Sequence, residues 1–419
     1  MYEFLVELWP ICRSITGNGV RETLRKIQQH IPIEIKEVSS GTQVFDWTVP
    51  KEWNITEAFV EDESGNRIID FANNNLHVMG YSTPIDEWMD LEELQKHIFS
   101  LEDQAEAIPY VTSYYSEKWG FCLSHTQRLT LKPGKYRACI KSNLQNGSLT
   151  YGELKIKGSS DREIFISTYV CHPSMANNEL SGPVVATWLA KWLLSAPRKY
   201  SYRIIFVPET IGSITYLSKY KDVLQAKVIA GFNLSCVGDD RTYSFVASRY
   251  GNTYADNLIT AVLEDDYSGF DRYSYLDRGS DERQYCAPGI DLPLVTFCRS
   301  KFGTYPEYHT SLDNLDLVSE SALCDSLEVM KKIIHLAEVN GRYKINTYGE
   351  PQLGKYGLYP TTSTKKSIDL IRDQRNFIAY ADGKNDLLEI RRITGLHFNE
   401  IIRFAKVLFE AKLVDRSEI

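Results

Sequence analysis

The residues with the clearest potential for chemistry follow the apolar run 164–170, in the segment 171–182 with the sequence CHPSMANNELSG. β-Branched and aromatic residues fill this run, which predicts a buried strand. Ligands of open α/β sheets bind at the carboxyl ends of such strands. His172 lies at that end, and a second histidine, His309, lies far along the chain. Because zinc and similar cations accept imidazole and carboxylate ligands, these segments predict the two halves of a metal site.

Three side chains of this predicted site have two interpretations each. His172 is either a ligand or a hydrogen-bonding residue of the core. Glu179 is either a carboxylate ligand or the acidic residue at the start of a helix beginning at Ser181, where its charge is favourable. Glu209 follows a second apolar strand, 201–207. It is either a general base beside a metal-bound water or a carboxylate in the first turn of a helix.

Three further segments carry polar residues after presumed strands, at 233–240, 278–285 and 308–314. In the last of them, Thr310 and Asp313 can donate or accept the hydrogen bonds that orient a ligating imidazole. Each segment alone is a weak signal. Together with the two strand ends above, we expect them to meet at one edge of one sheet.

Composition places the chain among globular proteins of two or three domains, since it has 419 residues. Its net charge of −8 argues against a protein that coats nucleic acid. We find no signal-peptide pattern and no apolar run near the roughly 18 residues of a membrane span. The eight cysteines form no CxxC pair, so we expect buried thiols in a reducing compartment and a cytoplasmic protein.

Between about 150 and 345, apolar strands alternate with helical stretches. This alternation predicts an α/β fold with a mostly parallel sheet sandwiched by helices. The expected strands are 149–157, 163–170, 201–207, 228–234 and 294–298. The expected helices are 184–194, 214–220, 254–263 and 320–339.

Two segments depart from this alternation. Residues 36–110 contain short aromatic and β-branched stretches between turn signals, which predicts an inserted β-rich module. Residues 355–419 read as helix, Gly-containing turn, helix and short strand, the pattern of a winged helix-turn-helix. The remaining residues, 1–35 and 111–348, are the expected α/β core.

The order of the motifs resembles the zinc-dependent aminopeptidases, a family with a phosphorylase/hydrolase-like α/β fold. The resemblance covers about 150–345 and the N-terminal helices. The positions that match are His172, Ser181-Gly182, Glu209 with Gly212-Ser213, Ser280-Asp281 and Tyr308-His309-Thr310.

Three positions depart from that family's pattern. Its bridging Asp falls on Asn178, the ligand Glu of its Glu-Glu pair falls on Thr210, and its strand-end Asp falls on Ser235. Neutral side chains cannot offset two divalent charges as three carboxylates do, so a two-zinc site does not carry over.

What remains of the pattern implies a site for one divalent metal ion, zinc. The resemblance assigns His172, Glu179 and His309 as its ligands, which leaves an open position as in catalytic zinc sites. Glu209 would be the general base.

The resemblance also implies residues that contact the substrate, a small peptide or another amide. Tyr308 would stabilise the tetrahedral oxyanion through its hydroxyl. Asp281 or Arg278 would bind the charged end of the substrate, and Asn178 would contact it too.

The complete arrangement of core, module and winged helix resembles, more specifically, bacterial aminopeptidase-like proteins associated with polysaccharide biosynthesis. The stretches 45–50 and 75–82 carry this resemblance. Two function hypotheses follow. The first is a metal-dependent hydrolase that cleaves an amide bond in a peptide, amino-acyl or amino-sugar-like substrate. The second is an inactive peptidase-like protein that binds or scaffolds.

The C-terminal segment 355–419 carries 12 Lys and Arg against 9 acidic residues, a weak excess of positive charge. DNA recognition needs a basic recognition helix, so we expect this domain to contact a protein partner or to pack within the chain instead.

Overall fold

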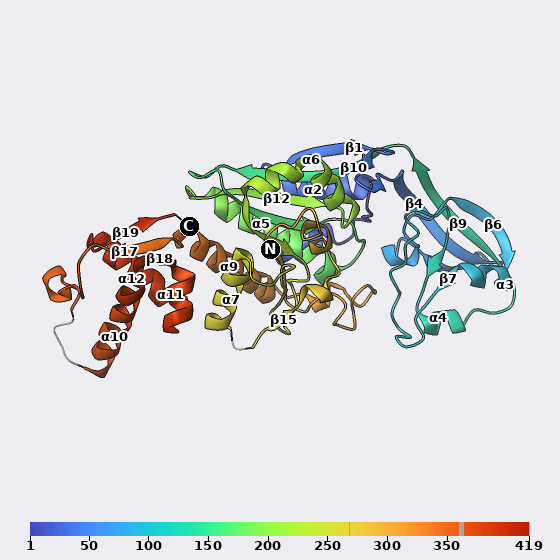
Figure 1. Cartoon of the computed structure of the whole chain (residues 1–419). Helices are drawn as coiled ribbons and strands as arrows, with labels where there is room; N and C mark the ends of the chain where they lie inside the picture. The colour runs from blue at the N-terminus through green and yellow to red at the C-terminus, as the bar shows by residue number, and fades with distance from the viewer. Residues whose placement is uncertain (268, 360–363, 419) are drawn as a thin grey trace. The chain divides into compact units, whose positions relative to one another are not determined.

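An eight-stranded sheet forms the centre of the larger of two compact units, Met1–Ala255 with Asp271–Glu328 (Figure 1). The computed structural model describes residues 1–267, 269–359 and 364–418. The strand order is β1 (Glu34–Ser39), β10 (Ser148–Ile156), β12 (Ser201–Val207), β11 (Glu163–Tyr169), β13 (Val228–Leu234), β16 (Leu294–Cys298), β14 (Ser244–Val246) and β15 (Asp271–Tyr273). The pairs β11–β12, β11–β13, β13–β16 and β14–β15 are parallel, which confirms the predicted, mostly parallel sheet.

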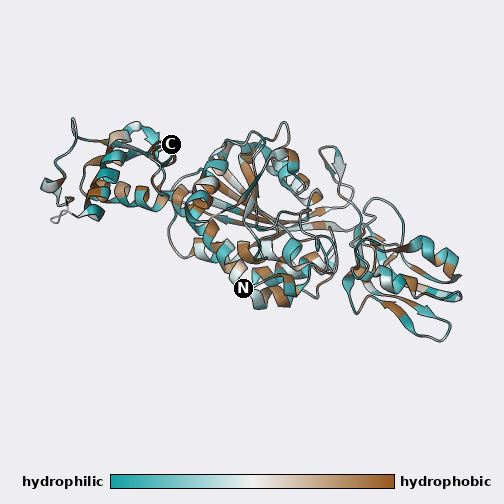
Figure 2. Cartoon of the chain, turned by 90° about the horizontal axis from the view of Figure 1, so that it is seen from below, coloured by the Kyte–Doolittle hydropathy of each residue, from teal (hydrophilic) through white to brown (hydrophobic). Residues whose placement is uncertain are grey.

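The two strands that lead into the predicted site are buried. All residues of β11 and all but the first of β12 are buried, and strands in the middle of Figure 2 are largely brown, its hydrophobic colour. Such continuous apolar runs are typical of parallel strands covered on both faces. The two strands pair in register, with Tyr169 opposite Val207. The segments after them therefore leave the sheet side by side.

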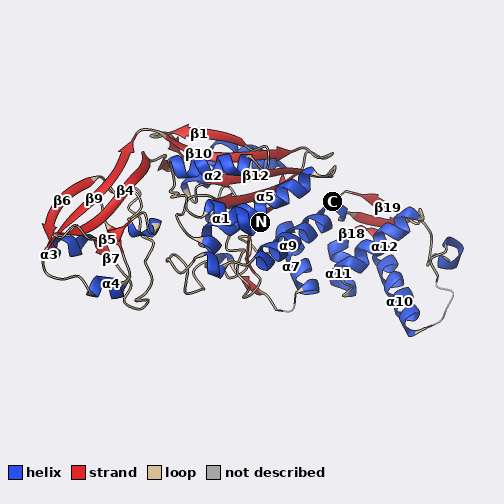
Figure 3. Ribbon diagram, turned by 180° about the vertical axis from the view of Figure 1, so that it is seen from behind, coloured by secondary structure: helices blue, strands red, loops and turns tan. Residues whose placement is uncertain are grey.

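Helices cover both faces of this sheet (Figure 3). Phe165 and Tyr169 pack in one apolar cluster with residues of α6 (Ile211–Lys227). Thr168 has the opposite side-chain direction and lies beside α5 (Ser181–Leu194). Outside the inserted module, the other α-helices with residues in this unit are α1 (Tyr2–Leu8), α2 (Asn18–Gln28), α7 (Tyr254–Asp266), α8 (Glu282–Tyr285) and α9 (Glu320–Val339).

The close approach of α5 to the sheet depends on Gly182. A Cβ on this residue would lie 2.5 Å from the carbonyl oxygen of Leu234, and it would also collide with the hydroxyl of Thr168. We expect Gly182→Ala to lower the free energy of unfolding by about 1–3 kcal/mol, the usual cost of overpacking. Urea unfolding measures this. Gly134→Ala is the control, since its Cβ would have no contact closer than 3.7 Å; equal losses in both variants would refute the steric argument.

A second, four-stranded sheet forms the inserted β-rich module. Its order is β5 (Arg67–Asp70), β4 (Glu52–Asp62), β9 (Lys135–Gln145) and β6 (Ile85–Asp90). The shorter elements of the module are α3 (Leu91–Leu94), β7 (Ile98–Phe99), β8 (Phe121–Cys122) and α4 (His125–Leu129), while the hairpin of β2 (Gln43–Val44) and β3 (Trp47–Thr48) packs with the core through Val44.

The limits of this module differ from the expected 36–110. Strand β1 pairs with β10 and so belongs to the main sheet, although part of it lies after residue 35. Strand β9 lies beyond residue 110, yet it pairs with β4 along its whole length. Both differences come from pairing between distant strands, which local composition does not reveal.

The smaller unit comprises Asp256–Phe270 with Val329–Ile419. It has a three-stranded sheet in the order β18 (Asp382–Asp386), β17 (Arg342–Ile345) and β19 (Val414–Ser417), with helices α10 (Lys365–Tyr380), α11 (Leu387–Thr394) and α12 (Phe398–Glu410). The expected winged-helix range 355–419 therefore begins too late, because β17 lies before it in sequence and inside its sheet. Residues 360–363 and 419 of that range lie outside the described residues.

The cysteines are all free. Six are buried, as expected, Cys12 is partly buried, and the expectation of burial is wrong for Cys324, which is exposed on α9. None of the described helices combines the length and the hydropathy that a membrane span requires.

Candidate functional site

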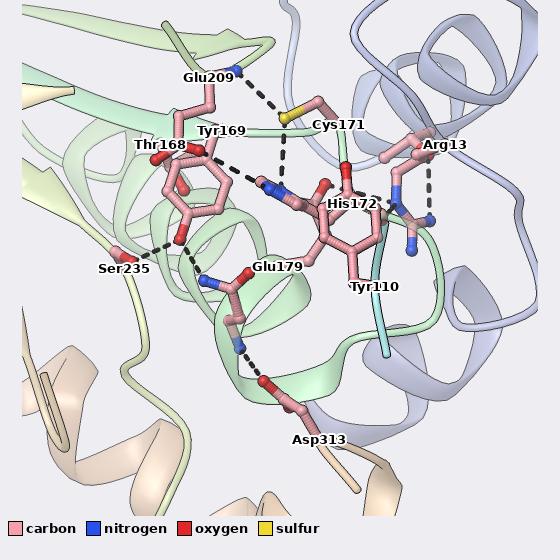
Figure 4. A network of polar contacts seen from close by, with 12 residues as sticks. Arg13, Tyr110, Thr168, Tyr169, Cys171, His172, Glu179, Glu209, Ser235 and Asp313 are labelled. Carbon is pink, nitrogen blue, oxygen red and sulfur yellow. Dashed lines mark hydrogen bonds and ion pairs between the residues drawn. The ribbon is translucent and has the colours of Figure 1, made fainter. Parts of the chain in front are cut away.

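The carboxyl ends of β11 and β12 bring two of the predicted residues together. His172 follows β11 and Glu209 follows β12, and the Nε2 atom of His172 lies 3.7 Å from Oε2 of Glu209 (Figure 4). The loop after β16 supplies His309, whose ring centre lies 5.3 Å from that of His172. The two imidazoles therefore lie close together, as predicted, although they are far apart in the sequence.

Glu179 contacts the other nitrogen of His172. Its Oε2 lies 2.9 Å from Nδ1, and its Oε1 lies 3.4 Å from Nε of Arg13. Glu179 belongs to a turn of π-helix, η3 (Ala176–Leu180), and no side chain caps the start of α5. The carboxylate thus neither caps the helix nor approaches the Nε2 side of His172. The expectation that Glu179 is a metal ligand together with His172 and His309 stays a prediction, and its contact with Nδ1 also suits a role in orienting the imidazole.

Arg13 completes this buried chain of contacts. Its Nε also donates a hydrogen bond to the carbonyl oxygen of His172 at 3.0 Å, and Nη1 donates to the carbonyl of Leu8. The side chains of Arg13 and Glu179 are both 0% exposed. Burial raises the pKa of Glu179, and the positive charge of Arg13 opposes that shift. Sequence reasoning missed Arg13, because its partners at the site, His172 and Glu179, are more than 150 residues away.

Burial favours the neutral form of both imidazoles. Burial, with the charge of Arg13, lowers the pKa of His172 to about 3. Burial, with His172 as a neighbour, lowers the pKa of His309 to about 3. Since Nδ1 of neutral His172 faces the carboxylate of Glu179, the lone pair of the ring is available at Nε2. Nε2 of His309 is buried and has no hydrogen-bond partner among the described residues.

A cavity of about 510 Å³ opens beside these groups. Its walls are formed by His172, Glu209 and His309 together with Ile15, Trp47, Tyr110, Thr112, Tyr114, Tyr115, Cys171, Thr210, Ile211 and Arg283. Burial and the neighbouring Asp281 raise the pKa of Glu209 to about 8, while Arg283 opposes the rise. A carboxyl group with a pKa near neutrality can both accept and return a proton.

Two of the predicted substrate residues do not line this cavity. Arg278 is exposed and its guanidinium lies over the ring of Tyr275, 4.8 Å from the centroid. Asp281 is buried, and its Oδ1 accepts hydrogen bonds from the backbone N–H of Thr210 and from the Ser213 hydroxyl, each at 2.7 Å. Asp281 therefore fixes the turn after β12 that carries Glu209. Burial raises its pKa to about 6.

Tyr308 and Asn178, which were expected to contact the substrate, are also absent from the cavity wall. The ring of Tyr308 stacks on that of His309, with 3.9 Å between centroids, and does not line the cavity. Burial and the charge of Glu209 raise the pKa of Tyr308. Asn178 is buried, and its Nδ2 donates to the hydroxyl of Tyr169 at 2.7 Å.

The hydroxyl of Tyr169 also lies 2.6 Å from Oγ of Ser235. Asn178 and Ser235 are two of the positions where the aminopeptidase pattern has acidic ligands. A tyrosine hydroxyl thus links these two neutral side chains, and the carboxylate of Asp313 accepts a hydrogen bond from the backbone N–H of Asn178 at 2.9 Å (Figure 4).

The structure adds residues that the sequence did not suggest. Arg283 lines the cavity. It belongs to the expected polar segment 278–285, but the sequence assigned no role to Arg283 itself. Tyr110 and Tyr114 line it as well, and their hydroxyls are 2.5 Å apart. The ring of Tyr110 contacts both His172 and His309, with 5.2 Å between centroids in each case. No motif marks these tyrosines, which come from an irregular segment before β8.

Left-handed backbone is concentrated in the loops of this site. Ser174, Thr210, Cys236 and His309 all have a positive φ between 43° and 62°. A β-branched residue such as Thr210 rarely adopts this conformation. Strain that is retained in several neighbouring loops is typical of functional sites.

Helix α12 of the winged-helix unit, all of whose residues are described, carries no cluster of unpaired positive charge. Arg403 pairs with Glu400, and Lys406 lies 3.9 Å from Glu410. Its basic residues are thus matched by acids on the same helix.

Comparisons with known proteins agree with this architecture. The family model described as "Domain of unknown function (DUF4910)" matches residues 2–340, and a winged helix-turn-helix model matches 341–416. A Clostridium acetobutylicum protein, whose name refers to polysaccharide biosynthesis and to an aminopeptidase-like domain, is 43% identical over 99% of this chain and 95% of its own length.

Solved structures give the same result for the fold. A crystal structure of a candidate peptidase from Clostridium acetobutylicum has a TM-score of 0.94 and 43% identity, covering 99% of this chain and 96% of the other. A zinc aminopeptidase from Bacillus subtilis has a TM-score of 0.55 and 14% identity, covering 80% and 94%. The chain therefore belongs to the DUF4910 family, and it combines an aminopeptidase-like α/β fold with a winged helix-turn-helix domain.

Proposed function

We propose that this protein is a metal-dependent amide hydrolase that uses one divalent metal ion, zinc, held by His172 and His309. One observation carries the proposal: two neutral imidazoles from distant loops lie with their ring centres 5.3 Å apart on the wall of a cavity. A substrate amide would take up one water and give a carboxylic acid and an amine. The B. subtilis neighbour, named a zinc aminopeptidase, supports the choice of metal.

The two imidazoles at the cavity are donors of a type that zinc accepts. Two imidazoles bound to one tetrahedral zinc through bonds of about 2 Å have ring centres about 5 Å apart. Nε2 of His309 is a buried nitrogen without a partner among the described residues, and Nε2 of His172 faces the carboxylate of Glu209. A zinc ion there would acidify a water and polarise the substrate carbonyl.

A second group of potential ligands fits a cation poorly. Cys171, His172 and Glu179 have donor atoms within 4.8 Å of one another. Burial raises the pKa of the Cys171 thiol, so the thiolate is disfavoured. The guanidinium of Arg13 also lies beside Glu179 and would repel a metal cation.

The chain's own side chains have distinct tasks in this proposal. Glu209 holds and transfers the proton between the attacking water and the leaving nitrogen. Glu179 orients His172, and Tyr308 restrains the ring of His309 by stacking. The hydroxyls of Tyr110 and Tyr114 line the cavity, and either can donate a hydrogen bond to the oxyanion.

One metal is favoured over two by the side chains at the remaining positions. Asn178 and Ser235 are tied together through Tyr169, and Thr210 accepts a hydrogen bond from Arg283. None of these three neutral side chains can offset the charge of a second divalent ion.

The first experiment measures zinc and turnover in the same samples. We expect about one zinc per chain, as in mononuclear catalytic sites, and its loss in His172→Ala and in His309→Ala. Glu179→Gln should weaken zinc binding by about 10–100-fold, since it removes the negative charge beside Nδ1 of the ligand His172. His125→Ala, in α4 of the inserted module, is the control and should keep its zinc.

Hydrolysis is assayed with amino-acyl anilides and N-acyl amino acids. Zinc without turnover on either class would favour the second hypothesis, an inactive binding protein linked to polysaccharide biosynthesis, as the name of the C. acetobutylicum relative suggests. Absence of zinc binding at micromolar zinc would exclude the proposed hydrolase.

We also propose that the winged helix contacts a protein partner in the cytoplasm. The matched charges on α12 and the free thiols of the chain support this. Sequence-specific retardation of a DNA fragment at low salt would contradict it.

A further inference from the structure

We propose that the cavity selects amides that carry a carboxylate on the amine side of the scissile bond, with Arg283 as the residue that binds this carboxylate. The substrate class is thus an N-acyl amino acid or a C-terminal peptide, and a free α-amine is not required. This inference rests on the proposed function and names the substrate of the same site.

Arg283 is fixed at the cavity wall in a way that suits an anion. Its Nε donates to the carbonyl of Ser280 at 3.0 Å, and Nη2 donates to the hydroxyl of Thr210 at 2.6 Å. Nη1 has no hydrogen-bond partner among the described residues, and it is not among their buried, unpaired atoms. A guanidinium held by two bonds with a donor left over is prepared for a carboxylate.

The charges around the cavity favour an anionic end of the substrate over a cationic one. Among the described residues that line it, Glu209 is the only acid and Arg283 the only permanently charged base. Glu209 is already assigned to proton transfer. Asp281 is buried, does not line the cavity, and accepts hydrogen bonds from Thr210 and Ser213. No acid therefore remains to bind the ammonium group of an aminopeptidase substrate.

The aromatic wall suits the acyl part of such a substrate. Tyr110, Tyr114, Tyr115 and Trp47 line the cavity. Trp47 and Tyr115 meet edge to face with 6.1 Å between ring centres, and they stay 40% and 57% exposed. Exposed aromatic rings at a cavity offer stacking surface to a flat apolar group. We therefore use benzoyl as the acyl group of the probe.

The test measures equilibrium binding to the zinc-loaded protein by calorimetry. The probes are N-benzoylglycine, its neutral amide and phenylalanine amide, which carries a free α-amine. We expect N-benzoylglycine to bind at least tenfold more tightly than either amide. Arg283→Gln should reduce this preference to less than threefold, and Arg162→Gln, which changes an exposed arginine before β11, should leave it unchanged.

Further arms separate the alternatives. The preference for N-benzoylglycine could survive in Arg283→Gln and disappear when zinc is removed. The carboxylate would then bind the metal and not Arg283, which would contradict the inference. The inference would also fall if Arg278→Gln abolished the preference, or if phenylalanine amide bound most tightly. Arg283-dependent preference without any turnover would support the carboxylate site while contradicting the proposed hydrolase.

Discussion

Glu209→Gln should retain about one zinc per chain and lose turnover by about 10²–10⁴-fold, the usual contribution of a general base. The substitution keeps the shape of the side chain but removes its capacity to accept a proton. In the structure this carboxyl lies 3.7 Å from Nε2 of His172, and burial raises its pKa to about 8. Zinc content and initial rates with N-acyl amino acids measure the two halves of the prediction.

The control for this variant is Glu117→Gln, which changes an exposed glutamate that pairs with Lys51. It should keep both zinc and activity. Loss of zinc from Glu209→Gln would reassign Glu209 as a ligand. Full activity with bound zinc would exclude it as the base.

Arg13→Met should have the largest effect on stability, about 3–5 kcal/mol. The substitution leaves the carboxylate of Glu179 buried without its positive partner, since both side chains are 0% exposed. It also removes the hydrogen bond to the carbonyl of His172. Urea unfolding of the metal-free protein gives the loss, and zinc binding of the folded variant reports the effect on His172.

A double variant separates the charge from the packing. In Arg13→Met with Glu179→Gln no charge is left unpaired, so we expect part of the lost stability to return. Arg25→Met on α2, which changes an exposed arginine, is the control. A single variant Arg13→Met as stable as this control would refute the role of the buried ion pair.

The elements of the α/β core could be predicted because their signals are local. Strand β11 and its neighbours are short apolar runs bounded by polar turns, and α9 has the expected limits of 320–339. The edge where His172 and Glu209 meet follows from the same pattern, since parallel strands end at one edge.

The interactions that decide the roles of side chains could not be predicted. Whether Glu179 binds a metal or orients His172 depends on which ring nitrogen it faces, and the sequence does not contain this. Arg13 and Tyr110 reach the site only through long-range packing. The choice between Arg278 and Arg283, five residues apart, depends on the short helix α8 that turns Arg283 toward the cavity.

The most direct test of the shared metal is a crystal structure of the zinc-loaded protein with anomalous data on both sides of the zinc edge. The account predicts one peak within bonding distance of both His172 and His309, on the cavity side of His172 and away from Glu179. A peak between Cys171 and Glu179, or no peak near the two imidazoles, would contradict it.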